Sequence, residues 1–299
     1  MASDRITFTS TQLLLQENLF EVQRQYNDKV MPATTGKKIN YLSDSPTTTS
    51  RVMSLRNQVR TNDQYQSNLT LARLNLNFAD NRLSQADTTM MKVREIVLRA
   101  NDASVSGSML NQLGEQIDDL KTELLTYANA TLDGKYIFSG TAITTQPFSG
   151  TPTAFAGNSN ALYIQATSTL RVQVNLDGNS IFSGSGGGVD IFDVLDDLKT
   201  DVQAGNAANI ATDLTRLDTG LTQVRNARSD IGIRMQQIEV NETALSESRV
   251  QILSDLSLLQ DVEIDKAISE LVTRETALRL VFSTTSRVLG VISGLPLGQ

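Results

Sequence analysis

The stretch LTLARLNLNFADNRLSQADTTMMKVREIVLRA, from Leu69 to Ala100, decides the fold of this chain. Apolar side chains recur in it at heptad intervals, and small or apolar side chains fill a second position of each heptad. This spacing is typical of an α-helix that packs along one seam, and alanine in the second position lets a neighbouring helix approach closely. The first set is Leu69, Leu76, Leu83, Met90 and Val97, and the second is Ala72, Ala79, Ala86, Val93 and Ala100.

The same apolar face extends upstream of this stretch. Val52, Leu55 and Val59 continue it, so the sequence predicts one helix from about Thr47 to Ala100. At about 1.5 Å per residue, such a helix is roughly 80 Å long. A shorter helix is predicted from the apolar spacing between residues 110 and 127.

A second seam runs through the C-terminal half of the chain. Arg228, Glu242 and Arg249 interrupt its apolar pattern. Either their charged heads extend to the rim of a helical bundle, or they pair with a second chain and set its register. The seam residues are Ile231, Ile238, Leu245, Ile252 and Leu259, preceded by Leu214, Leu217, Leu221 and Val224.

Both ends of the chain carry further apolar stripes. The long step from Leu259 to Ile264 rotates the stripe and predicts a hinge near Asp261. The N-terminal stripe is wide, so we expect more than one neighbour to cover it, and we expect Pro32 to end its helix. The residues expected to carry assembly contacts are Phe8, Leu15, Leu19, Val22, Ile268, Leu271, Leu278, Phe282 and Leu289.

The segment TTGKKINYLSDSPTTTS, Thr34 to Ser50, connects two predicted helices. A phosphate-binding loop would need a glycine where Met31 stands, so that function is rejected. The segment instead has the residues of a helix break. Gly36 can adopt a positive φ where the first helix stops. Asp44 or Ser45 can cap the next helix, and Pro46 suits its first turn.

The middle of the chain has an extended rather than a helical pattern. ALYIQAT (161–167) and LRVQVNL (170–176) are predicted to be strands, and Asp177-Gly178 is expected to form a tight turn. SGSGGG (183–188) is typical of a flexible linker.

These patterns predict a mainly α fold. A long antiparallel helical bundle or coiled coil is built from both chain ends, and a small β-rich domain is inserted in the middle. The predicted domains are the paired terminal helices at 1–44 and 262–299, the long bundle at 45–140 and 189–261, and the β-rich outer domain at 141–188.

The composition excludes several classes of function. The chain contains no cysteine and no histidine, which removes disulfides, thiolate chemistry and the commonest proton-transfer side chain. Its net charge of −7 makes nucleic acid an unsuitable partner. The neighbouring carboxylates Asp118-Asp119 and Asp196-Asp197 point about 100° apart on a helix, so we expect solvated faces rather than an acid–base pair. We predict no catalytic, cofactor-binding or metal site, and therefore no enzyme.

The sequence also bears on export. The N-terminus MASDRITFTSTQLLLQ lacks the basic start and unbroken apolar core of a cleavable signal peptide. No run of about 18 apolar residues, the length that a membrane span needs, is present.

Three segments resemble bacterial flagellin-like axial proteins. DGKYIFSGTAITTQPF (133–148) is similar to the Gly-x-Tyr-aliphatic-Phe-x-Gly segment of the family's hook–filament junction proteins. LTQVRNARSDIGIRMQQIE is similar to their Arg-Ala-x-x-Gly-x-Arg segment, through Arg225, Arg228, Gly232 and Arg234. The family-wide N-terminal motif matches at Thr35, Gly36, Lys37, Ile39, Ser43, Asp44 and Pro46.

The resemblance implies a structural adaptor of the extracellular flagellum, exported without signal cleavage through the flagellar type III apparatus. The implied partners are copies of the chain itself in a ring, hook-associated protein 1, flagellin and a flagellar export chaperone. Two alternatives are flagellin itself and an unrelated coiled-coil surface protein. The tail GLPLGQ lacks the ending of flagellins, which favours the junction proteins.

Overall fold

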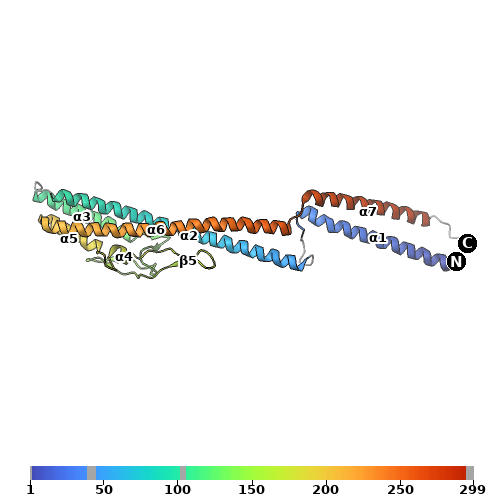
Figure 1. Ribbon diagram of the computed structural model, residues 1–299, viewed down its shortest axis with the longest axis horizontal. Helices are drawn as coiled ribbons and strands as arrows, with labels where there is room; N and C mark the ends of the chain where they lie inside the picture. The colour runs from blue at the N-terminus through green and yellow to red at the C-terminus, as the bar shows by residue number, and fades with distance from the viewer. Residues whose placement is uncertain (1, 39–44, 102–105, 294–299) are drawn as a thin grey trace. The chain divides into compact units, whose positions relative to one another are not determined.

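The computed structural model describes residues 2–38, 45–101 and 106–293, and Figure 1 shows their helices and strands. The side chains of residues 2–9, 11, 12 and 289–293 lie outside this description. Two compact units make up the chain: one comprises Met1–Thr61 and Ser248–Gln299, and the other comprises Asn62–Glu247. Helices dominate, and the strands are short, so the predicted mainly α fold with a small β-rich part is confirmed.

Two long helices, α2 (Pro46–Ala100) and α6 (Ala207–Gln260), form the frame of the fold. Within Asn62–Glu247 they run antiparallel, because their side chains pair in reverse order: Arg73 contacts Glu242, and Asp80 contacts Arg228. The heptad residues of α2 lie at the centre of the core. Those fully shielded from solvent include Leu69, Leu76, Leu83, Met90 and Val97, together with Ile238 on α6.

Two shorter helices, α3 (Gly107–Ala128) and α5 (Ile191–Ala204), pack against each other and complete the bundle. The sequence pattern did not separate α5 from α6. Gly205 makes the separation, because it takes a left-handed φ of 65° at the C-terminus of α5. Asp190 caps the other end, where its carboxylate accepts hydrogen bonds from the backbone N–H groups of Phe192 and Asp193 at 2.9 and 3.2 Å.

The inserted part contains three separate two-stranded antiparallel sheets. In chain order, they are β1 (Thr131–Leu132) with β2 (Lys135–Tyr136), β3 (Phe148–Ser149) with β4 (Ala154–Phe155), and β5 (Tyr163–Gln165) with β6 (Arg171–Gln173). The last pair confirms the two predicted strands. A buried cluster of four rings from the insertion and α5 fixes this part on the bundle: Phe138, Phe148, Phe182 and Phe192.

The predicted tight turn at Asp177-Gly178 is wrong. Asp177 is the N-cap of a short helix, α4 (Gly178–Phe182), and its side chain accepts a hydrogen bond from the backbone N–H of Asn179 at 3.0 Å. Glycine follows because the backbone of Phe138 passes very close: a Cβ at Gly178 would lie 2.4 Å from the Phe138 carbonyl oxygen. The Asp-Gly pair therefore serves a cap and a close approach rather than a hairpin.

In the unit formed by Met1–Thr61 and Ser248–Gln299, α1 (Ala2–Thr35) pairs antiparallel with α7 (Ile264–Ser293). The prediction that Pro32 ends the first helix is wrong, because Pro32 lies inside α1. Proline removes one N–H donor, but its carbonyl still accepts a hydrogen bond from the N–H of Gly36 at 2.9 Å. The helix therefore continues for one more turn, to Thr35.

The helices end close to the predicted breaks, at Thr35 before α2 and at Gln260 before α7. The compact units, in contrast, divide within the long helices, after Thr61 and after Glu247. The division into domains at residues 1–44, 45–140, 141–188, 189–261 and 262–299 stays a prediction.

Candidate assembly surface

The terminal helices expose large apolar side chains. On α1, Phe20 is 70% exposed, and on α7, Phe282 is 62% exposed. An aromatic ring this accessible to water does not contribute to a core within its own chain. The exposed apolar residues of the pair are Leu13, Leu14, Phe20 and Met31 on α1, and Ile264, Ile268, Val272, Leu280, Phe282 and Val288 on α7. We call these residues the terminal apolar surface.

The contact between α1 and α7 buries little. Among the described side chains of these two helices, Ala267 and Thr285 are buried, whereas Leu15, Leu19, Val22, Leu271 and Leu278 are only half-buried. The sequence grouped Ile268 and Phe282 with Leu271 and Leu278 in one stripe, but Ile268 and Phe282 are exposed whereas Leu271 and Leu278 are half-buried. Phe8 and Leu289, the remaining predicted assembly residues, have side chains outside the described residues.

Polar contacts fix the register of the α1–α7 pair. The amine of Lys29 lies 2.7 Å from the Glu270 carboxylate, and this hydrogen bond lowers the pKa of Glu270. One turn further along, the Arg274 guanidinium donates to the Gln25 side-chain carbonyl at 2.9 Å. Exposed pairs of this kind contribute little to stability, so they set alignment more than they hold the helices together.

The two helix breaks lie next to each other. Gly36 has a φ of 69°, and its carbonyl accepts a hydrogen bond from the N–H of Val262 at 2.9 Å. The N–H of Lys38 donates to the carbonyl of Gln260 at 2.7 Å, and Lys37 and Asp261 form an isolated antiparallel bridge. Backbone hydrogen bonds thus join both breaks, although they are more than 200 residues apart in the sequence.

The start of α2 contains the other predicted hinge residues. Pro46 is its first residue, where a missing N–H has no cost. Asp44, the predicted cap, lies outside the described residues. The carbonyl of Ser45 accepts a hydrogen bond from Thr49 at 2.8 Å, which opens the first turn of the helix.

The charged residues of the α6 seam pair within the chain. Arg228 binds Asp80 at 2.9 Å, and Glu242 forms an ion pair with Arg73. Both side chains stay partly exposed, as the rim interpretation expects, and each also has a partner on α2 that the sequence did not predict. The sequence does contain a signal for these ion pairs, because Arg73 and Asp80 are seven residues apart, beside the apolar seam. The predicted seam residues Leu245, Ile252 and Leu259 are half-buried.

The paired carboxylates also differ from prediction. Asp196 binds Lys121 of α3 at 2.6 Å, whereas its neighbour Asp197 binds Arg216 of α6 at 2.6 Å. Asp118 contacts Lys199 at 3.1 Å. The predicted divergence of adjacent carboxylates is thus present, but each of these three faces a basic residue of another helix instead of only water.

The acidic side chains and the helices of the described residues bear on metal binding and on membrane insertion. Within residues 2–38, 45–101 and 106–293, no group of three acidic side chains is placed to hold a metal ion. A search of the same residues finds no helix that could span a membrane.

Known proteins similar to this chain belong to the flagellum. Residues 6–143 match the family model of the bacterial flagellin N-terminal helical region. Flagellar hook-associated protein 3 of Escherichia coli strain K12 is 26% identical, over 94% of this chain and 97% of its own length. Flagellin of Bacillus subtilis strain 168 is 23% identical, over 79% of this chain and 80% of its own.

Solved structures share the fold. A protein assigned as a flagellar hook-associated protein from Vibrio parahaemolyticus aligns with a TM-score of 0.69 at 20% identity, over 73% of this chain and 99% of its own. Flagellar hook-associated protein 3 from Legionella pneumophila aligns with a TM-score of 0.63 at 18% identity, over 70% and 98%. The resemblance to flagellin-like proteins that the sequence motifs indicated is confirmed.

Proposed function

We propose that this chain, a flagellin-like protein similar to hook-associated protein 3 over nearly its whole length, is a structural adaptor at the junction between the hook and the filament of the bacterial flagellum. In this role it binds flagellar proteins on two sides. We infer that these partners are hook-associated protein 1 and flagellin, and that copies of the chain lie side by side in a ring. The protein works by binding and shape, and no chemical step is involved.

The observation that carries this proposal is the terminal apolar surface. The α1–α7 pair buries few apolar side chains against itself and exposes many, among them Phe20 and Phe282. Exposing a large apolar side chain rather than burying it forgoes about 1.5–3 kcal/mol. A surface with several such residues on two helices is typical of a site that other protein chains cover. Helices that gain their apolar contacts from neighbours suit a protein that completes its folding on assembly.

Flagellin-like adaptors must join unlike neighbours, and the chain offers different surfaces for this. The terminal apolar surface is one, and the inserted β-rich part presents another. We propose export without a cleaved signal through the flagellar type III apparatus, with an export chaperone bound to the terminal apolar surface until the chain is exported. A chaperone there would keep α1 and α7 from associating early.

The test is the position and necessity of the protein on flagella. The chain carrying an epitope tag in the inserted part, for example at the exposed Ser159, should label a narrow band at the hook end of each filament. Cells that lack the protein should build hooks but release flagellin into the medium. Label along the whole filament would contradict the adaptor role.

Flagellin is the second candidate, because Bacillus subtilis flagellin also matches this chain. A filament protein polymerises alone. If the chain is an adaptor, purified protein at high concentration should therefore not lengthen added filament fragments. Growth into long filaments would favour flagellin instead.

A further inference from the structure

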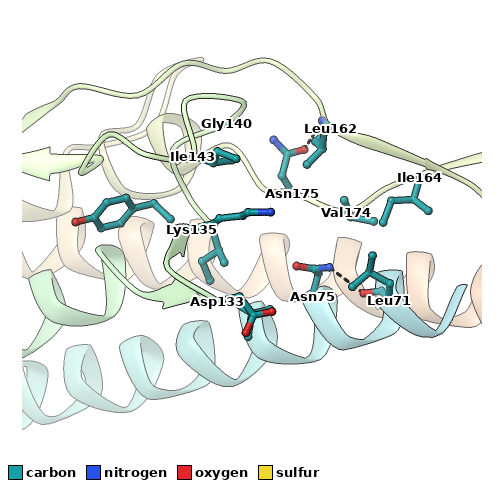
Figure 2. A pocket seen from close by; sticks show the side chains of 13 residues that line it. Leu71, Asn75, Asp133, Lys135, Gly140, Ile143, Leu162, Ile164, Val174 and Asn175 are labelled. Atoms are coloured by element: carbon teal, nitrogen blue, oxygen red, sulfur yellow. Dashed lines mark hydrogen bonds between the residues drawn. The ribbon is translucent and has the colours of Figure 1, made fainter. Parts of the chain in front are cut away.

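A small hollow lies on the unit Asn62–Glu247, between α2 and the inserted strands. Figure 2 shows it from close by, with Leu71 and Asn75 of α2 on one side and Leu162, Ile164 and Val174 on the other. Its volume is about 190 Å³. Sites for small organic ligands run from about 300 to 1,000 Å³. The hollow is therefore of the size to receive one protein side chain rather than a cofactor.

The chemistry of the hollow is apolar with one available positive charge. Lys135 extends into it, with its amine between Asn75 and Asn175 in Figure 2. Both amides are already engaged, since Asn75 donates to the Leu71 carbonyl at 2.8 Å and Asn175 donates to the Asn160 carbonyl at 2.8 Å. Within the described residues, the amine of Lys135 has no hydrogen-bond or ion-pair partner. Asp133 lines the hollow as well, so an acidic guest would approach from the side of Lys135.

The same unit carries a matching surface on α6. Ile233 and Val240 are 55% and 63% exposed, although both are large aliphatic residues inside a regular helix. Asp230 precedes Ile233 by one turn and is exposed without an ion-pair partner in the described part of the chain. The stripe is thus aliphatic with a flanking negative charge, the complement of the hollow.

The two surfaces cannot meet within one chain. Ile231 and Ile238 of α6 are buried against the bundle, and Arg234 donates to the Asn175 carbonyl at 3.1 Å, beside the hollow. Ile233 is about 200° around the helix from Ile231, at about 100° per residue, so it points away from the bundle, and it is not among the residues that line the hollow. Two complementary patches on different faces of one molecule form a head-to-tail contact between copies.

We propose that this hollow receives Ile233 of a second copy of the chain, whose Asp230 pairs with Lys135. Such a contact is far smaller than the roughly 1,200 Å² of a stable standard interface. It holds only where the terminal apolar surface already brings copies together, and it then sets the rotation of each copy relative to the next. This inference rests on the proposed function, because it assumes copies arranged side by side.

The test uses cysteine pairs, which are unambiguous in a chain without cysteine. The variant Leu162→Cys with Ile233→Cys, placed in flagella of the source bacterium and mildly oxidised, should give a ladder of covalent oligomers. Each single variant should give monomer only, because the contact is head-to-tail. The matched control, Leu162→Cys with Thr243→Cys, places the second thiol on an exposed site about 15 Å further along α6 and should give at least fivefold less ladder.

Charge reversal tests the ion pair in the same assay. Adding Lys135→Glu, or adding Asp230→Lys, should each lower the ladder yield several-fold, and adding both should restore it. Both residues are exposed, so these changes leave the folded chain intact, which far-ultraviolet circular dichroism would verify.

Three results would overturn the contact between copies, and one would overturn the proposed function as well. A ladder no stronger than the control, with the variant still present at the hook end, overturns the inference and leaves the adaptor function standing. Dimers from Ile233→Cys alone indicate a symmetric contact and also overturn it, as does a ladder indifferent to both charge reversals. Absence of the chain from flagella overturns the proposed function and this contact together.

Discussion

The guanidinium Nε of Arg228 lies 2.9 Å from a carboxylate oxygen of Asp80, which joins two helices across 148 residues of sequence. Both side chains are about one-third exposed, so water screens their attraction. The hydrogen bond that Arg228 donates to Asp80 raises the pKa of the already basic guanidinium. The pair therefore sets the register of α2 against α6 more than it stabilises the bundle.

A double-mutant cycle with Arg228→Gln and Asp80→Asn measures this coupling. We expect a coupling free energy of about 0.5–1 kcal/mol in urea unfolding, since the pair is partly exposed. The exposed pair Arg99–Glu95, within α2 itself, is the control and should couple more weakly. A coupling free energy above about 3 kcal/mol would show that the pair is shielded from water and stabilises the bundle strongly, which would contradict a role limited to setting the register.

Leu83→Asp should unfold the bundle. Leu83 is fully shielded from solvent, and an unpaired carboxylate there would cost well above the roughly 2–5 kcal/mol expected for Leu83→Ala. Leu74→Asp is the control, because Leu74 is on the same helix but exposed, and it should change the free energy of unfolding by about 0.5 kcal/mol or less. Similar melting temperatures for the two aspartate variants would refute the placement of the seam.

The terminal helices should exchange their amide hydrogens quickly in the isolated chain. We predict weak protection over residues 2–34 and 264–293, because the α1–α7 contact buries few of the described side chains. Hydrogen exchange read by mass spectrometry on the dilute monomer checks this, with α2 residues 69–97 as the protected reference. Slow exchange throughout both terminal segments would remove the physical basis for folding coupled to assembly.

The carboxyl group of Asp190 caps the N-terminus of α5 and also has a shifted pKa. Burial raises the pKa of its carboxyl above the ordinary value of 3.8, although its hydrogen bonds from Asp193 and Phe192 act in the opposite direction. The folded state therefore binds the proton more readily than the unfolded state. The stability that this protonation contributes is present below pH 3.8 and is lost as the pH rises through the raised folded-state pKa.

Asp190→Asn keeps the cap and removes the titration, so above this window it should be at least as stable as the natural chain. As the pH falls through the window, the stability of the natural chain should increase relative to that of Asp190→Asn. Asp190→Ala should lose about 1 kcal/mol, because the cap itself is gone. Urea unfolding from pH 3 to 7 measures the stability of both variants. If the natural chain became more stable relative to Asp190→Asn as the pH rises, the expected direction of the pH dependence would be wrong.

Replacing Gly178 and Gly232 by alanine should change the stability of the protein in opposite directions. A Cβ at Gly178 would lie 2.4 Å from the Phe138 carbonyl oxygen, whereas a Cβ at Gly232 in α6 meets nothing within 4 Å. Gly178→Ala should therefore destabilise by about 1–3 kcal/mol, and Gly232→Ala should stabilise by about 0.5–1 kcal/mol. Thermal unfolding checks both, and a stabilised Gly178→Ala would show that the backbone of Phe138 yields easily.

Periodicity alone predicted the long helices, although it missed α4 and did not separate α5 from α6. The heptads from Leu69 to Val97, continued upstream by Val52, Leu55 and Val59, predicted a helix from about Thr47, one residue from the observed start of α2 at Pro46. The step after Leu259 located the break before α7. Helix formation and apolar spacing are properties of consecutive residues, so they can be read without knowing the partner. The fold class followed from these local patterns, whereas the family resemblance came from three sequence motifs, among them DGKYIFSGTAITTQPF (133–148).

Only the tertiary structure decided which surfaces face inward and which charges meet. Ile268 and Phe282 share their apolar spacing with Leu271 and Leu278, but they are 48% and 62% exposed, whereas Leu271 and Leu278 are half-buried. The partners of Arg228 and Glu242, and the closeness of Phe138 that makes Gly178 necessary, likewise depend on segments distant in sequence. Local pattern fixes what a helix is, whereas the rotation and register of two helices fix what each side chain contacts.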